Sequence, residues 1–78
     1  MNEAADIELD LSGLRCPMPL LKTKQALNKM NPGQTVKVKA TDPGSERDFK
    51  VFAEQSGHLL LNMHQENGVF LYLLQKAE

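Results

Sequence analysis

The chain has 78 residues, of which 41% are hydrophobic and 24% are charged. A chain this short encloses one small core, so we expect a single domain over residues 1–78 and exclude a two-domain enzyme with a deep substrate cleft. Nine Lys and Arg against ten Asp and Glu give a net charge of -1. Strong direct nucleic-acid binding is not expected, because the cation excess that phosphate binding requires is missing.

The first residues, the apolar runs and the cysteine count indicate the cellular compartment. The first residues are acidic, whereas a secretory signal is basic and then apolar, and no apolar run approaches the roughly 20 residues of a membrane span. We therefore expect a cytoplasmic protein without membrane contact, whose residues 1–5 form a disordered N-terminus. Cys16 is the only cysteine, which excludes an internal disulfide and a cysteine-rich zinc site.

The first half of the chain predicts a strand, a helix and a second strand. Residues 7–11 alternate apolar and acidic side chains, as a half-buried strand does. From Pro17 the pattern predicts a helix of about four turns that ends at residues 31–33, Asn-Pro-Gly. Its inward side chains are expected to be Leu20, Thr23, Leu27 and Met30. Residues 34–41 alternate again, which predicts a strand with Val36, Val38 and Ala40 inward.

The second half predicts another helix and a hairpin. Asp42 followed by Pro43 fits an N-cap with proline at the first helical position, and the helix should end at Gly57. Its expected inward stripe comprises Phe49, Phe52, Ala53 and Ser56. Two apolar runs, residues 59–65 and 69–75, flank an Asn-Gly pair, which is typical of a two-residue hairpin turn.

These elements in the order β-α-β-α-β-β predict an α/β (α+β) two-layer sandwich, a four-stranded mixed sheet with two helices packed on one face. The other face should be polar. Its expected side chains are Glu8, Asp10, Lys37, Lys39, Asn62 and His64. Leu60 and Val69, or the alternate residues of the hairpin, would add apolar groups there that favour dimerisation or partner docking.

The segment that carries chemistry is residues 14–19, LRCPMP, between the first strand and the first helix. Its thiol lies at or next to a helix N-cap, where unpaired amides and the helix dipole favour thiolate over thiol. Arg15 adds a neighbouring cation, and the fixed φ of Pro17 and Pro19 supports the turn. Pro19 stands where a Cys-x-x-Cys motif has its second cysteine, so intramolecular dithiol redox chemistry is excluded.

A nucleophilic thiolate without a resolving cysteine suits a group carrier, and a persulfide is a natural cargo. The alternative is a buried cysteine that acts as a small hydrophobic residue, which is the commonest fate of a lone cysteine. The Arg-Cys-Pro-x-Pro setting at a helix start favours the carrier.

At these residues the chain resembles the TusA/SirA-like family of sulfur carriers, whose mark is a Cys-Pro-x-Pro motif at the start of the first helix. The resemblance covers nearly the whole chain. The matching positions are Leu9-Asp10, residues 13–19, Pro32-Gly33, Asp42-Pro43, Arg47-Asp48, Gly57 and the hydrophobic last strand. Met18 stands where the best-known member has an acidic residue, and the helix after Asp48 also departs from that member.

The resemblance implies a sulfurtransferase-type carrier whose Cys16 accepts persulfide sulfur from a cysteine desulfurase or another donor protein. The carrier then passes the sulfur to an acceptor protein, for tRNA thiolation, sulfur oxidation or cofactor assembly. Arg15, Pro17 and Pro19 match the supporting frame of the family cysteine. The chain has no Schiff-base lysine motif, so another protein must mobilise the sulfur, and no small-molecule cofactor is expected.

Several other residues have a structural and a functional interpretation. Met18, Lys22 and Arg47 are candidates for partner docking, although exposed lysines and arginines are often only solvated charges. Lys24 joins Arg15 and Lys22 in a possible basic rim around the thiol. His58 and His64 follow no metal-ligand spacing, so no metal site is expected, and a Cys-His dyad is a minor alternative.

Two competing functions remain open. One is a non-catalytic interaction or regulatory module that uses the open sheet face, for example to bind RNA. The RNA-binding version is disfavoured, because the chain has only four aromatic residues on which bases could stack. The other is a single-thiol redox sensor, in which Cys16 oxidises to sulfenic acid or to a mixed disulfide.

Overall fold

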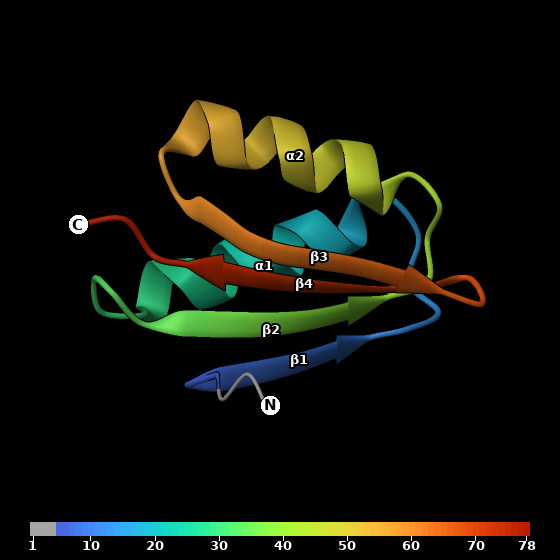
Figure 1. The fold of residues 1–78 in the computed structure, drawn as a ribbon, viewed down its shortest axis with the longest axis horizontal. Helices are drawn as coiled ribbons and strands as arrows, with labels where there is room; N and C mark the ends of the chain where they lie inside the picture. Colours follow the sequence, from blue (N-terminus) through green and yellow to red (C-terminus); the bar gives the residue numbers. More distant parts are fainter. Residues whose placement is uncertain (1–4) are drawn as a thin grey trace.

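The computed structural model describes residues 5–78 and contains a four-stranded sheet covered by two helices (Figure 1). The predicted disorder of residues 1–5 falls almost entirely outside the described residues. The elements in chain order are β1 (Ile7–Leu11), α1 (Met18–Lys29), β2 (Thr35–Ala40), α2 (Ser45–Ser56), β3 (Leu59–Glu66) and β4 (Val69–Gln75). This order and the two-layer architecture confirm the predicted fold class.

The sheet has the order β1-β2-β4-β3 and is mixed. β1 pairs with β2 in parallel, with Leu9 opposite Val38, and β4 pairs antiparallel with both β2 and β3. The turn between β3 and β4 is Asn67-Gly68, whose φ values of 53° and 78° are those of the predicted two-residue hairpin turn. A register shift between Leu60 and Asn62 makes a bulge in the edge strand β3.

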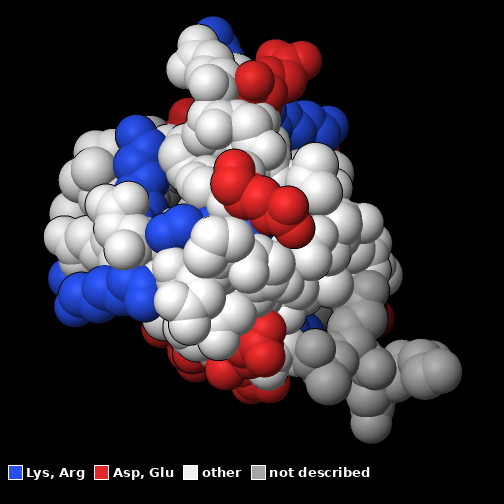
Figure 2. All heavy atoms as spheres, turned by 90° about the vertical axis from the view of Figure 1, so that its left-hand side faces the viewer, with Lys and Arg blue, Asp and Glu red and all other residues white. Residues whose placement is uncertain are grey.

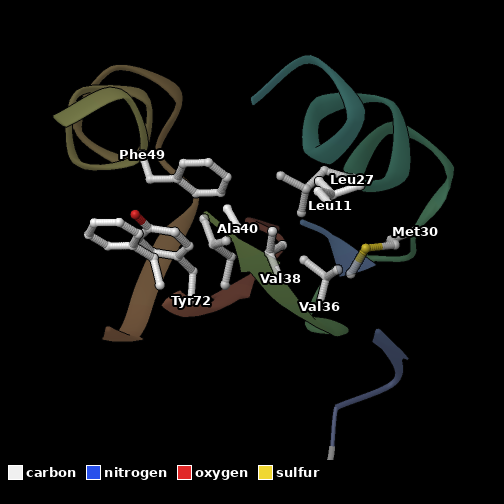
Figure 3. Packing of buried hydrophobic residues seen from close by; sticks show 10 residues of the cluster. Leu11, Leu27, Met30, Val36, Val38, Ala40, Phe49 and Tyr72 are labelled. Carbon is white, nitrogen blue, oxygen red and sulfur yellow. The ribbon is translucent and has the colours of Figure 1, made fainter. Parts of the chain in front are cut away.

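The core lies between the sheet and the two helices (Figure 3). Val36, Val38 and Ala40 are fully buried, as their alternation in sequence predicts. Tyr72 of β4 stacks on Phe49 of α2, with ring centroids 4.3 Å apart and planes 9° apart. Its hydroxyl lies 2.7 Å from Ser45 Oγ in a buried hydrogen bond. This contact fixes the first turn of α2 on the sheet.

The predicted start of the second helix is wrong. Asp42 is not its N-cap and Pro43 is not its first residue, because residues 42–45 form a turn closed by a 3.0 Å hydrogen bond from Ser45 N–H to Asp42 O. The Asp42 carboxylate accepts the N–H of Gly44, and α2 begins at Ser45 with Gly44 as N-cap. An Asp side chain stabilises such a turn as readily as it caps a helix.

Smaller differences concern helix length and the apolar stripes. α1 begins at Met18, one residue later than predicted, and comprises 12 residues. Ser56 is exposed and accepts a hydrogen bond from His58 N–H, so it does not belong to the buried stripe of α2. Leu60 packs against the core because it pairs with the inward-facing Leu74. The exposed leucines of β3 are Leu59 and Leu61.

The outer sheet face has the predicted polar character, with half-buried Leu71 and Leu73 of β4 between the charged strands. All four aromatic side chains lie away from this face, in or against the core. Figure 2 shows the end of the molecule near the C-terminus, where basic and acidic side chains are interspersed with uncharged surface. Among the helices of residues 5–78, none is long and apolar enough to cross a membrane.

Candidate functional site

Two loops meet beside the sheet and bring the cysteine to α2. Because β1 and β2 are parallel, the loops that follow them leave the same edge of the sheet, on the right in Figure 1. The N–H of Gly13 in the first loop donates a 2.8 Å hydrogen bond to Thr41 Oγ1 in the second. At Gly44, an added Cβ would lie 3.9 Å from Cys16 Cβ. The two loops therefore form one site.

The cysteine lies in a turn that leads into α1. Cys16 directly precedes Pro17, the N-cap of α1, and the peptide bond between them is cis. The N–H of Met18 donates a 2.8 Å hydrogen bond to Arg15 O. Pro19, in the first turn of the helix, is fully buried, whereas Cys16 is exposed. The turn is thus anchored in the core and presents its sulfur to solvent.

The thiol of Cys16 has an acidic partner. Its Sγ donates a hydrogen bond of 2.9 Å to Oδ2 of Asp48, in the first turn of α2. This hydrogen bond, followed by partial desolvation and the negative charges of Asp48 and Asp42, raises the pKa of Cys16. The direction of this pKa shift is opposite to the lowering that the helix start and Arg15 were expected to produce.

The reason lies in which groups reach the sulfur. Pro17 and Pro19 have no N–H, and the N–H of Met18 already bonds to a carbonyl, so the start of α1 offers few free donors. Within residues 5–78, the ion pairs are Lys50–Glu46 and His64–Glu66, and neither involves Arg15. The Asp48 carboxylate contacts the thiol, so it affects the pKa of Cys16 more strongly than the α1 dipole and Arg15, which make no direct contact.

The candidate docking residues are exposed. Met18 is 38% exposed although it is a large apolar side chain, and Lys22 is exposed on α1. Arg47, also exposed, lines a groove between α1 and α2 that Asp48 lines as well. The other lining residues of this inter-helix groove are Leu20, Lys24, Gly44, Val51, Phe52 and Gln55.

The lining of the inter-helix groove combines apolar side chains with the cations of Lys24 and Arg47 and the carboxylate of Asp48. Lys24 Nζ lies 5.4 Å from the centroid of the Phe52 ring, a cation–π distance. Val51, on the same helix, is 40% exposed. Lys24 and Arg47 lie on opposite helices, so a segment bound in this groove meets positive charge on both sides.

Both histidines have partners away from the thiol. His58 Nδ1 accepts the N–H of Ala77, and its ring lies against Phe52 at the C-terminal half of α2. His64 Nε2 is 3.4 Å from Glu66 Oε1 in the hairpin. Among the described residues, no three His, Cys, Asp or Glu side chains are grouped as metal ligands.

The sequence interpretation missed the roles of Asp48, Asp42 and Gly44 at the thiol. Asp42 was predicted as the N-cap of the second helix, and Asp42 and Asp48 were both noted as positions of family resemblance. A signal was nevertheless present, because a parallel pair of β-α units places the loop after the second strand beside the loop after the first. The residues 42–48 that follow β2 were therefore candidates to face Cys16.

Comparison with known proteins agrees with this fold. The family model of Sulfurtransferase TusA matches residues 7–76. A sulfur carrier protein TusA of Allochromatium vinosum is 50% identical over 72 residues, which are 92% of this chain and 95% of the relative. A putative sulfur carrier protein of Bacillus subtilis, YrkI, is 39% identical over 94% of this chain and 97% of its own length.

A solved structure supports the same assignment. The crystal structure of a SirA-like protein from Desulfitobacterium hafniense superposes with a TM-score of 0.79 at 27% identity, covering 92% of this chain and 99% of that chain. The family match over residues 7–76 and the relative at 50% identity agree on the family. The chain belongs to the TusA family of sulfurtransferases.

Proposed function

We propose that the protein is a sulfur carrier that bears a persulfide on Cys16. The observation that supports this most directly is that the only thiol is exposed on an anchored turn, in a chain of the TusA family. An exposed sulfur is reachable by the cysteine of a donor protein and then by that of an acceptor. The relatives from Allochromatium vinosum and Bacillus subtilis carry the name sulfur carrier.

The transfer needs no cofactor of this chain. The Cys16 sulfur, as thiolate, attacks the outer sulfur of a persulfide on the donor, and a new S–S bond forms. The donor's S–S bond breaks, and the donor cysteine leaves as a thiolate that takes up the proton released by Cys16. The products are a Cys16 persulfide and a donor thiol, so the sulfur atom moves without net oxidation or reduction.

The surface around Cys16 supports docking of protein partners. Met18 offers an exposed apolar contact beside the sulfur, and Lys22 and Arg47 add positive charge. We propose that the acidic, partly apolar surface of a persulfide donor such as a cysteine desulfurase covers this region. Arg15, Pro17 and Pro19 are proposed to support the turn and the anion that forms during transfer.

The two alternative functions have less support. Bases stack on exposed aromatic rings in RNA-binding sheets, but the aromatic side chains of this chain lie on the covered side of the sheet. A redox sensor relies on a thiol with a lowered pKa, whereas the pKa of Cys16 is raised. Neither alternative requires the cysteine to be presented beside a docking groove.

Intact-mass spectrometry tests the proposal. The protein is incubated with a cysteine desulfurase and free cysteine, in parallel with Cys16→Ser. A mass gain of one sulfur atom that a reductant removes, present in the wild type and absent in the variant, supports the carrier. If Cys16 can be alkylated but gains no sulfur from a panel of persulfide donors, the proposed function is wrong.

A further inference from the structure

The pair of Cys16 and Asp48 is held by the fold from both sides. Asp48 belongs to the first turn of α2, where its N–H bonds to Gly44 O and the adjacent Phe49 is fully buried. Cys16 is fixed by the buried Pro19 in the first turn of α1. The 2.9 Å contact therefore joins two anchored elements that are 32 residues apart in sequence.

The charges near the pair are unevenly distributed. The acidic groups that act on the thiol are Asp48 of α2 and Asp42 of the preceding turn, both half-buried. The cations nearby are Arg15 beside the cysteine, Arg47 beside Asp48, and Lys24 of α1 across the inter-helix groove. Within the described chain none of these three cations forms an ion pair. The carboxylates thus remain uncompensated next to the sulfur.

We propose that Asp48 is a positioning residue that accepts the thiol hydrogen of Cys16 and keeps the thiol of the free carrier neutral. When a docking partner separates the two side chains, the Cys16 thiol loses this hydrogen bond and becomes free to ionise. The inference rests on the proposed carrier function, since it describes how the same cysteine is regulated. A neutral thiol reacts slowly with disulfides and oxidants, because the thiolate is the reactive species. The free carrier would be protected in this way between encounters.

The same carboxylates act on the loaded carrier. A persulfide is more acidic than a thiol, so its outer sulfur carries negative charge at neutral pH. Asp48 and Asp42 repel that charge, whereas they attract the S–H of the unloaded cysteine. The outer sulfur is therefore expected to turn away from α2 and toward an acceptor. Asp42 and Asp48 thus hold the unloaded Cys16 sulfur against α2 and turn the outer sulfur of the loaded carrier away from α2.

The pH dependence of alkylation by iodoacetamide, a neutral reagent, tests the inference on the full chain. Asp48→Asn removes the charge while it preserves the size of the side chain. We expect its alkylation midpoint to shift to lower pH, and its rate at pH 7 to increase several-fold. Glu46→Gln is the matched control, because it removes one negative charge from the same turn, and Glu46 bonds to Lys50 rather than to Cys16. Its profile should follow the wild type.

Sulfur loading is measured on the same variants to separate this inference from the carrier function. Asp48→Asn should accept sulfur from a desulfurase at least as fast as the wild type. An unchanged alkylation midpoint in Asp48→Asn overturns the positioning role, even when loading is normal. If no variant and no wild-type sample loads, the carrier function fails, whereas a shifted midpoint still supports the contact between Asp48 and Cys16.

A measurement on the wild type avoids dependence on the folding of a variant. The alkylation midpoint of Cys16 is compared between the native protein and the same protein unfolded in urea. The inference expects the higher midpoint in the native protein, because the carboxylate is close to the sulfur only after folding. A native midpoint equal to or below that of the unfolded chain overturns the inference.

Discussion

The backbone N–H of Gly13 donates a 2.8 Å hydrogen bond to Oγ1 of Thr41 and joins the loop after β1 to the loop after β2. The first of these loops continues to Cys16, and the second continues to the turn that begins α2 and its Asp48. The hydroxyl of Thr41 is therefore a link between the two halves of the site. Thr41 takes no part in the hydrogen bond between the Cys16 thiol and Asp48.

Loss of this hydroxyl should loosen the site as well as reduce stability. Thr41→Val leaves Gly13 N–H without its partner at similar side-chain size, and we expect a loss of about 1 kcal/mol in the free energy of unfolding. Because the loops then separate more easily, the alkylation midpoint of Cys16 should move to lower pH. Urea unfolding and iodoacetamide kinetics measure the two effects, with Thr41→Ser as control. A shift as large in Thr41→Ser would contradict the role of the hydroxyl.

The buried hydrogen bond between Ser45 and Tyr72 should contribute to stability as a pair. Tyr72→Phe leaves the hydroxyl of Ser45 without its partner in the core, which costs about 1 to 3 kcal/mol. Ser45→Ala should cost a similar amount for the reciprocal reason. The double variant should cost less than the sum, because no unpaired group remains. Denaturant unfolding of the four proteins measures the coupling, and additive losses would show that the two hydroxyls act independently.

Stability should decrease at alkaline pH because of the buried tyrosine. Burial is the largest cause that raises the pKa of Tyr72, whereas the hydrogen bond with Ser45 lowers it. The unfolded state therefore releases this proton first, at pH values near 10. The stabilisation is complete below that pH and is lost as the pH rises through the higher pKa of the folded protein.

The free energy of unfolding, measured between pH 8 and pH 11, tests this contribution. Ionisation of Tyr72 should lower it by at most about 1.4 kcal/mol per pH unit. Tyr72→Phe has no group that ionises here, so its stability should fall less steeply than that of the wild type over the upper part of the range. Lysine deprotonation affects both proteins equally and cancels in the difference. Parallel curves for the two proteins would refute the assignment to Tyr72.

The order of elements was predictable because alternation and turn residues are local signals. Residues 7–11 and 34–41 alternate with period two, and Asn67-Gly68 adopts the positive φ values that this pair favours. The start of α2 was not predictable from the same kind of signal. Asp42 and Pro43 suit both a helix start and a turn, and the choice depends on Ser45, whose hydroxyl bonds to Tyr72 in the core.

The position of the reactive cysteine was predictable, but its electrostatic state was not. The LRCPMP segment lies at the junction of a strand and a helix, which is visible in the sequence. The group that acts most strongly on the thiol, Asp48, is distant in sequence and close only in the folded chain. Sequence reasoning weighed the adjacent Arg15 and the helix start, since these are the neighbours of Cys16 along the chain.

Charge reversal at the proposed docking residues should slow sulfur acceptance. Lys22→Glu and Arg47→Glu each replace a cation by an anion on the surface around Cys16, so an acidic partner is repelled and associates more slowly. We expect the rate of sulfur loading from a desulfurase to fall several-fold at low salt and the deficit to shrink as salt is added. Lys39→Glu is the control, because Lys39 lies on the opposite face of the sheet and undergoes the same change of charge.

The alkylation rate of Cys16 in the same variants distinguishes docking from chemistry. Iodoacetamide is neutral and small, so a variant that only weakens association should react with it at nearly the wild-type rate. Slow loading with normal alkylation would therefore assign Lys22 and Arg47 to partner recognition. Equal slowing in Lys39→Glu would instead indicate a response to net charge alone, and the surface around the thiol would then have no special part in docking.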